Sequence, residues 1–164
     1  MATTDRPSHL PPLGAHESGE VGKELQGTLL ELIALSLIGK QLHWNVVGPL
    51  FRPLHLHLDE LVDSWQELSD TVAERAVALG FIPDGQARAV AAGSPLAPVA
   101  RGSLEDHLVV RDLTHRVAEV SERVRVRMNR LGDADLASQD VLIEVVRELE
   151  KQQWMLRAQL GEHA

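Results

Sequence analysis

Apolar residues recur every three to four positions in four long stretches of the chain, which is the spacing of one face of a helix. The stretches cover about residues 19–45, 53–80, 103–131 and 136–160. The middle of the first stretch, LLELIALSLIG, is apolar on more than one face, so other elements must cover it on several sides. The pattern therefore predicts an all-α chain of four long helices, packed as a bundle inside an oligomer.

The residues between these stretches are of the types that end and begin helices. Gly48 and Pro49 stop the first helix. Ser103 and Asp106 have the spacing of a capping box at the start of the third helix. Asp135 is a candidate cap for the fourth. We therefore expect the third helix to begin at Ser103 and the fourth to begin directly after Asp135.

A long connection, about residues 81–102, joins the second helix to the third, and residues 86–92 within it predict a short helix. Residues 1–18 are rich in proline and poor in core residues, so we expect a mobile N-terminal tail. Residues 162–164 form a short C-terminal end. Residues 19–161 are then one domain, a four-helix bundle with a single long crossover, which is the topology of ferritin-like bundles.

Composition narrows the class of protein further. The 164 residues are 44% apolar and only 3% aromatic, so aliphatic side chains must build the core. The absence of cysteine excludes disulfides, thiolate zinc sites and thiol catalysis. No apolar run approaches a membrane span and no signal peptide is visible, so we expect a cytoplasmic protein without a membrane partner. The net charge of −8 argues against a general nucleic-acid binder and suits a protein that collects cations.

Five potential metal ligands lie between residues 43 and 74: His43, His55, Asp59, Asp70 and Glu74. His55 and Asp59 are four apart, as are Asp70 and Glu74, so each pair stacks on one face of the second helix. The two pairs share one stripe but lie roughly 16 Å apart along the axis. Because metal–ligand bonds are only about 2 Å long, one small metal centre cannot use both pairs of the same chain.

An antiparallel copy of the second helix removes this difficulty. When Asp59 faces the partner's Asp70, the same register brings His55 opposite the partner's Glu74. The two-fold axis then falls between residues 64 and 65, where Trp65 is placed to anchor the dimer. A two-fold pairing is self-complementary and makes the site twice. We therefore predict a metal centre of imidazole and carboxylate ligands shared between subunits.

The segment HWNVVGP, followed by H-x3-D and then D-x3-E, resembles the Dps family, the mini-ferritins known as DNA-protection proteins of starved cells. The stretches LGFIPDG and AAGSPL resemble the family's connection between its second and third helices, and the likeness covers roughly residues 20–160. The resemblance implies a hollow dodecamer. It also implies that His43, His55 and Asp59 of one subunit bind iron together with the partner's Asp70 and Glu74.

The resemblance further implies a ferroxidase that oxidises Fe²⁺ with hydrogen peroxide, or more slowly with O₂, and stores the ferric mineral, which protects DNA from oxidative damage. The alternative is a DNA-binding shell protein that compacts the nucleoid, with iron oxidation secondary. Such a protein needs a basic tail, because phosphate contacts dominate its affinity. Here Arg6 and Lys23 are offset by Asp5, Glu17 and Glu20, which argues against DNA binding at neutral pH.

Several other side chains are candidates for smaller roles. Trp44 adjoins the ligand His43, and an indole beside an iron site can be sacrificially oxidised. By resemblance, an ion pore would be formed by acids around the start of the fourth helix, for which the residue types alone also allow a capping role: Asp133, Asp135 and Asp140. His9 and His16 of the tail are candidates for a zinc site. The arginines of RVRVRMNR favour ion pairs between subunits over a DNA-binding patch.

Overall fold

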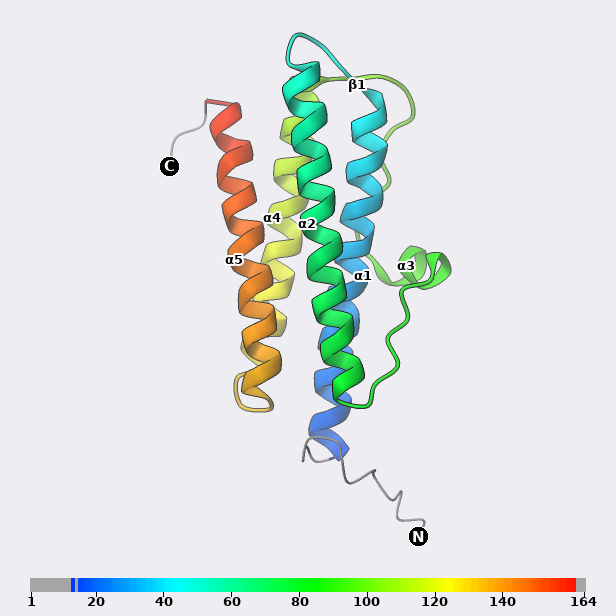
Figure 1. Cartoon of the computed structure of the whole chain (residues 1–164), viewed down its shortest axis with the longest axis vertical. Helices are drawn as coiled ribbons and strands as arrows, with labels where there is room; N and C mark the ends of the chain where they lie inside the picture. Colours follow the sequence, from blue (N-terminus) through cyan, green and yellow to red (C-terminus); the bar gives the residue numbers. More distant parts are fainter. Residues whose placement is uncertain (1–12, 14, 162–164) are drawn as a thin grey trace.

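A computed structural model of the chain describes residue 13 and residues 15–161. Four long helices and one short helix account for most of it (Figure 1): α1 Ala15–Asn45, α2 Phe51–Ala78, α3 Ala87–Gly93, α4 Asp106–Leu131 and α5 Leu136–Gln159. Two short strands, β1 Val46–Val47 and β2 Leu104–Glu105, pair in parallel. The all-α prediction is confirmed, and the strands are additional to it.

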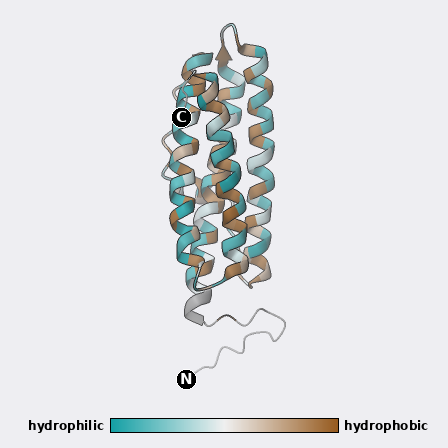
Figure 2. Cartoon of the chain, turned by 90° about the vertical axis from the view of Figure 1, so that its left-hand side faces the viewer, coloured by the Kyte–Doolittle hydropathy of each residue, from teal (hydrophilic) through white to brown (hydrophobic). Residues whose placement is uncertain are grey.

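The four long helices form one bundle in which α1 packs against α2, and α4 packs against α5. The long connection between α2 and α4 runs along the outside of α1 and carries α3 (Figure 1). Apolar and polar segments alternate along every long helix (Figure 2), and the apolar ones meet in one continuous core of mainly Leu and Val. This confirms the ferritin-like topology, including the short helix in the crossover.

The helix boundaries depart from the expected ones at three places. Helix α1 begins at Ala15, four residues before the expected start. Helix α2 begins at Phe51 rather than at Pro53. The capping box at Ser103 is wrong, because residues 104–105 pair with β1 and α4 begins only at Asp106. Asp135, by contrast, does cap α5, since its side chain accepts a hydrogen bond from the Ser138 N–H.

Trp65 does not lie where its spacing placed it. Trp65 has no exposed surface, and its indole N–H donates to Gln152 Oε1 over 2.7 Å in the bundle core. Gly39 lies against it, so that a Cβ there would approach the Trp65 ring to 2.8 Å. The prediction that Trp65 anchors a dimer is therefore wrong. Trp44 and Trp154, by contrast, are 68% and 60% exposed.

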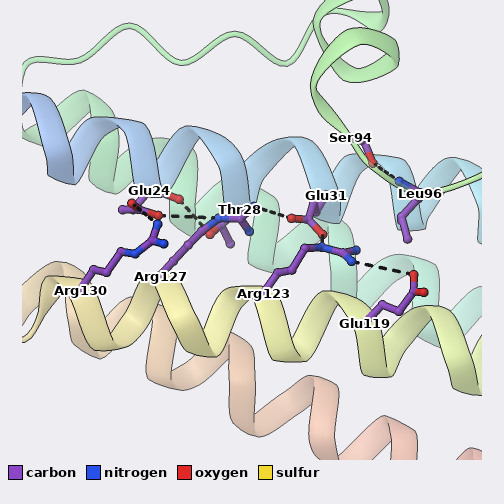
Figure 3. Close-up of polar contacts among 9 residues, drawn as sticks. All are labelled: Glu24, Thr28, Glu31, Ser94, Leu96, Glu119, Arg123, Arg127 and Arg130. Carbon is purple, nitrogen blue, oxygen red and sulfur yellow. Dashed lines mark hydrogen bonds and ion pairs between the residues drawn. The ribbon is translucent and has the colours of Figure 1, made fainter.

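A network of ion pairs joins α1 to α4 (Figure 3). Glu31, with no exposed surface, accepts from Arg123 Nε at 2.6 Å and from Arg127. About two turns earlier on α1, Glu24 accepts a hydrogen bond from Arg130 Nη1 at 3.0 Å. The arginines of the RVRVRMNR run thus pair inside the chain, which corrects the expectation of pairs between subunits.

Candidate metal centre

The candidate site lies at the end of the bundle where the chain turns from α1 into α2. His43 stands in the last turn of α1, and His55 and Asp59 stand in the first turns of α2. One ligand atom from each of the three side chains lies within 4.8 Å of the other two. Within the described part of the chain, no other group of three such side chains is this close.

The two histidines hold each other in place through the backbone. His43 Nδ1 lies 3.0 Å from the carbonyl oxygen of His55, and His55 Nδ1 lies 3.0 Å from the carbonyl oxygen of His43. Their rings stack with centroids 3.6 Å apart. Because a carbonyl oxygen only accepts hydrogen bonds, these contacts favour the tautomer of each neutral ring in which Nδ1 carries the proton and Nε2 keeps a free lone pair. The Nε2 atoms are therefore prepared to bind a metal cation.

Asp59 completes this half-site and is paired with Lys40. The Lys40 ammonium lies 2.6 Å from Asp59 Oδ1, and both side chains are more than a third exposed. The hydrogen bond from Lys40 holds the pKa of Asp59 below its ordinary value, against the opposing effect of partial desolvation. His43 Nδ1 also lies 3.3 Å from the same oxygen. The carboxylate is thus ionised at neutral pH, and a metal cation that binds it competes with the lysine for its negative charge.

Asp70 and Glu74 are exposed on α2 and lie outside the group of three close ligands. Asp70 borders a groove of about 400 Å³ between α1 and α2, whose lining is mainly apolar and includes Leu29, Ile33, Leu37, Ala73 and Pro83. Leu37 is 59% exposed. The structure thus brings three of the five predicted ligands together and leaves two on an open, partly apolar face.

The other candidate residues differ in their surroundings. Asp135 accepts from Arg75 Nη2 at 2.6 Å and from Ser138, so its carboxylate is engaged in holding α2 to α5. Burial raises its pKa, but the bonds from Ser138 and Arg75 outweigh burial and lower it. Asp133 and Asp140 are exposed. The tail candidates fall outside the described residues, His9 entirely and His16 in its side chain.

Two residues near the site were missed from the sequence. Lys40 precedes His43 by three positions on one helix, so helical spacing could have placed it on the same face. Asp106 was interpreted as part of a capping box, yet its carboxylate accepts hydrogen bonds from the backbone N–H groups of Leu50 and His107, each over 2.7 Å. No spacing within the sequence points to the contact with Leu50, 56 positions away.

Comparison with known proteins agrees with this fold. The family model of the ferritin-like domain matches residues 22–164. The chain is 35% identical over 154 residues to DNA protection during starvation protein 2 of Deinococcus radiodurans, covering 94% of this chain but only 64% of that protein. It is 37% identical over 153 residues to the DNA protection during starvation protein of Mycolicibacterium smegmatis, covering 92% and 82% of the two chains.

Among solved structures, the tetragonal form of Mycobacterium smegmatis Dps superposes with a TM-score of 0.89 at 35% identity, covering 95% of this chain and 94% of that one. A bundle with one long crossover, matched over most of its length, defines a ferritin-like protein. Within that class, the chain belongs to the Dps family. In the part of the chain that the structure describes, no helix is long and apolar enough to cross a membrane.

Proposed function

We propose that this protein is a ferroxidase that oxidises Fe²⁺ at sites shared between two subunits and stores the ferric product. The observation that carries the proposal is the half-site of His43, His55 and Asp59, whose imidazole Nε2 atoms and carboxylate are prepared for a cation. Membership of the ferritin-like family supports iron as that cation. The partner's Asp70 and Glu74 complete the site.

The ligand types suit both oxidation states of iron. Imidazole is a borderline ligand that holds Fe²⁺, whereas carboxylate oxygen is hard and favours Fe³⁺. Two Fe²⁺ ions give one electron each to hydrogen peroxide, which takes up two protons and leaves as two molecules of water. Transfer of both electrons at one centre releases no hydroxyl radical. Because each ion has few protein ligands, the ferric product can leave for a mineral core; O₂ is the slower oxidant.

The apolar groove beside Asp70 supports the pairing of two subunits. Asp59 and Asp70 lie on one stripe of α2, and the groove exposes Leu37 on the neighbouring face of α1. Burial of this face against its antiparallel copy removes apolar surface from water and brings the histidine end of one subunit to the acidic end of the other. We propose that such dimers build the twelve-subunit shell. Twelve chains of charge −8 carry −96 in total, a field that concentrates Fe²⁺.

Complementation between two inactive variants tests the shared site. Asp59→Ala and Glu74→Ala should each abolish rapid Fe²⁺ oxidation by peroxide in stopped-flow measurements, while the assembly stays intact. A mixed dimer of the two variants has one doubly damaged site and one intact site. Shells assembled from equal amounts should therefore recover about one quarter of the wild-type rate, since half of randomly formed dimers are mixed.

The outcome separates this proposal from a site within one chain. If all five ligands served one metal inside a single chain, no mixture could restore activity. Wild-type rates in the assembled single variants would show that these residues are not ligands at all. A crystal structure with iron soaked in supplies the direct check, because the metal should lie between His43 of one subunit and the partner's Glu74.

A further inference from the structure

The turn that carries both histidines has few backbone hydrogen bonds of its own. Between the end of α1 and the start of α2, the Phe51 N–H donates to the Gly48 carbonyl over 3.0 Å, and the Leu54 N–H donates to the Leu50 carbonyl over 3.0 Å. The reciprocal bonds between His43 and His55 require that these two helix ends keep one relative position. Packing of α1 against α2 fixes the two helices as a whole, and a contact from outside the turn can add support at their ends.

Asp106 provides that support from the far end of the crossover. It is the first residue of α4 and is only 6% exposed. Its Oδ2 accepts from the Leu50 N–H at 2.7 Å, directly before α2, and its Oδ1 accepts from the His107 N–H at 2.7 Å. Each carboxylate oxygen thus binds a different segment, so the side chain ties the turn to α4.

The backbone at Gly48 leaves room for the same carboxylate. Its φ of +130° is a conformation that side-chain-bearing residues rarely adopt. A Cβ at this position would come within 2.5 Å of Asp106 Oδ2. The parallel pairing of Val46 with Leu104 and of Val47 with Glu105 holds the two segments in register on the preceding residues. The glycine of HWNVVGP therefore leaves the space that Asp106 occupies.

We propose that Asp106 is a positioning residue for the metal centre, and this inference rests on the proposed function. By holding Leu50 it sets where α2 begins relative to the end of α1. That position decides whether His55 Nδ1 reaches the His43 carbonyl and His43 Nδ1 reaches the His55 carbonyl. Asp106 touches neither metal nor oxidant, and it acts through the orientation of the two imidazoles.

Binding of Co²⁺, used as a coloured substitute for Fe²⁺, tests the proposal in the intact assembly. Asp106→Ala should weaken Co²⁺ binding about tenfold or more, as loss of residues that orient metal ligands does, and should shift the visible absorption bands that report ligand geometry. Asp106→Asn should recover part of the affinity, because its amide oxygen can still accept from Leu50. Gly48→Ala should reproduce the loss by pushing the carboxylate aside.

Gln152→Leu is the matched control. It leaves another buried N–H, that of Trp65, without its acceptor, but at a distance from the turn. Gln152→Leu should lower the urea unfolding midpoint about as much as Asp106→Ala does. It should leave the Co²⁺ spectrum and the Co²⁺ affinity unchanged. If Asp106→Ala behaves like this control, the positioning role is overturned and Asp106 is only structural. If His55→Ala binds Co²⁺ as the wild type does, the metal centre itself is wrong, and the inference falls with it.

Discussion

The buried pairing of Glu31 with Arg123 and Arg127 predicts a large loss of stability when its charge is removed. In Glu31→Gln the side-chain volume is nearly unchanged, but two guanidinium groups lose their nearest carboxylate. Each keeps only a longer ion pair, Arg123 with Glu119 at 3.9 Å and Arg127 with Glu24 at 3.8 Å. One nitrogen of each arginine, Arg123 Nη2 and Arg127 Nη1, is already buried without a hydrogen-bond partner. The variant therefore adds to the unsatisfied hydrogen-bonding groups that these arginines already bury.

Removal of one partner from a buried ion pair costs about 3–5 kcal/mol, because the remaining charge stays desolvated. Here Glu31 has no exposed surface, but the side chains of Arg127 and Arg123 are 17% and 32% exposed and can turn partly toward water. We therefore expect the lower end, about 3 kcal/mol. With a urea dependence of about 1–3 kcal/mol per molar, the unfolding midpoint should fall by roughly 1–3 M.

Urea unfolding followed by circular dichroism, at equal protein concentrations and low ionic strength, measures the effect. Glu150→Gln is the matched control, because Glu150 of α5 pairs with Arg125 of α4, and both side chains are about half exposed, 45% and 50%. It should cost less than about 1 kcal/mol. The triple variant Glu31→Leu, Arg123→Leu, Arg127→Met should return close to wild-type stability. An unchanged midpoint for Glu31→Gln, or a triple variant weaker than the single one, would refute the reasoning.

Three further predictions concern the site and the surface. Lys40→Met should raise the affinity for Co²⁺ a few-fold, because the cation no longer competes with an ammonium for the charge of Asp59; equal or lower affinity in a Co²⁺ titration would contradict this. Leu37→Glu should disfavour pairing of subunits, which analytical ultracentrifugation would detect as smaller particles, whereas unchanged sedimentation would count against the groove as an interface. The assembled protein should not retard DNA in a gel shift at pH 7.5 with chelator present, and retardation at sub-micromolar protein would show a basic surface presented outward.

Much of the fold follows from the sequence because its information is local. The helical period and the glycines between the apolar stretches place all four long helices, and the same period puts His55 beside Asp59. The end of α1 and the start of α2 adjoin along the chain, so His43 also comes to the site through a short connection. These relations need no knowledge of distant contacts.

The failures concern contacts between residues far apart in the chain. Local spacing does not show the partner of the RVRVRMNR run, because Glu31 lies 92 positions before Arg123. Asp106 has the spacing of a helix-capping residue, and nothing in its local sequence shows that its carboxylate accepts from the Leu50 N–H. A position near the expected two-fold axis does not say which way a side chain points, and Trp65 points into the core. Only the packed bundle decides these three cases.

The three tryptophans differ in exposure, so their fluorescence should distinguish the metal site from the core. The chain has no tyrosine, so excitation near 280 nm reaches indole almost alone. Trp65 is buried in the core of the single chain, whereas Trp44 and Trp154 are 68% and 60% exposed on it. Iodide should therefore quench only the red-shifted emission of the exposed pair and leave a blue-shifted remainder from Trp65. Trp44 adjoins His43, so paramagnetic Co²⁺ at the site should quench the fluorescence of Trp44 before that of the other tryptophans. This quenching would measure metal loading without an added label.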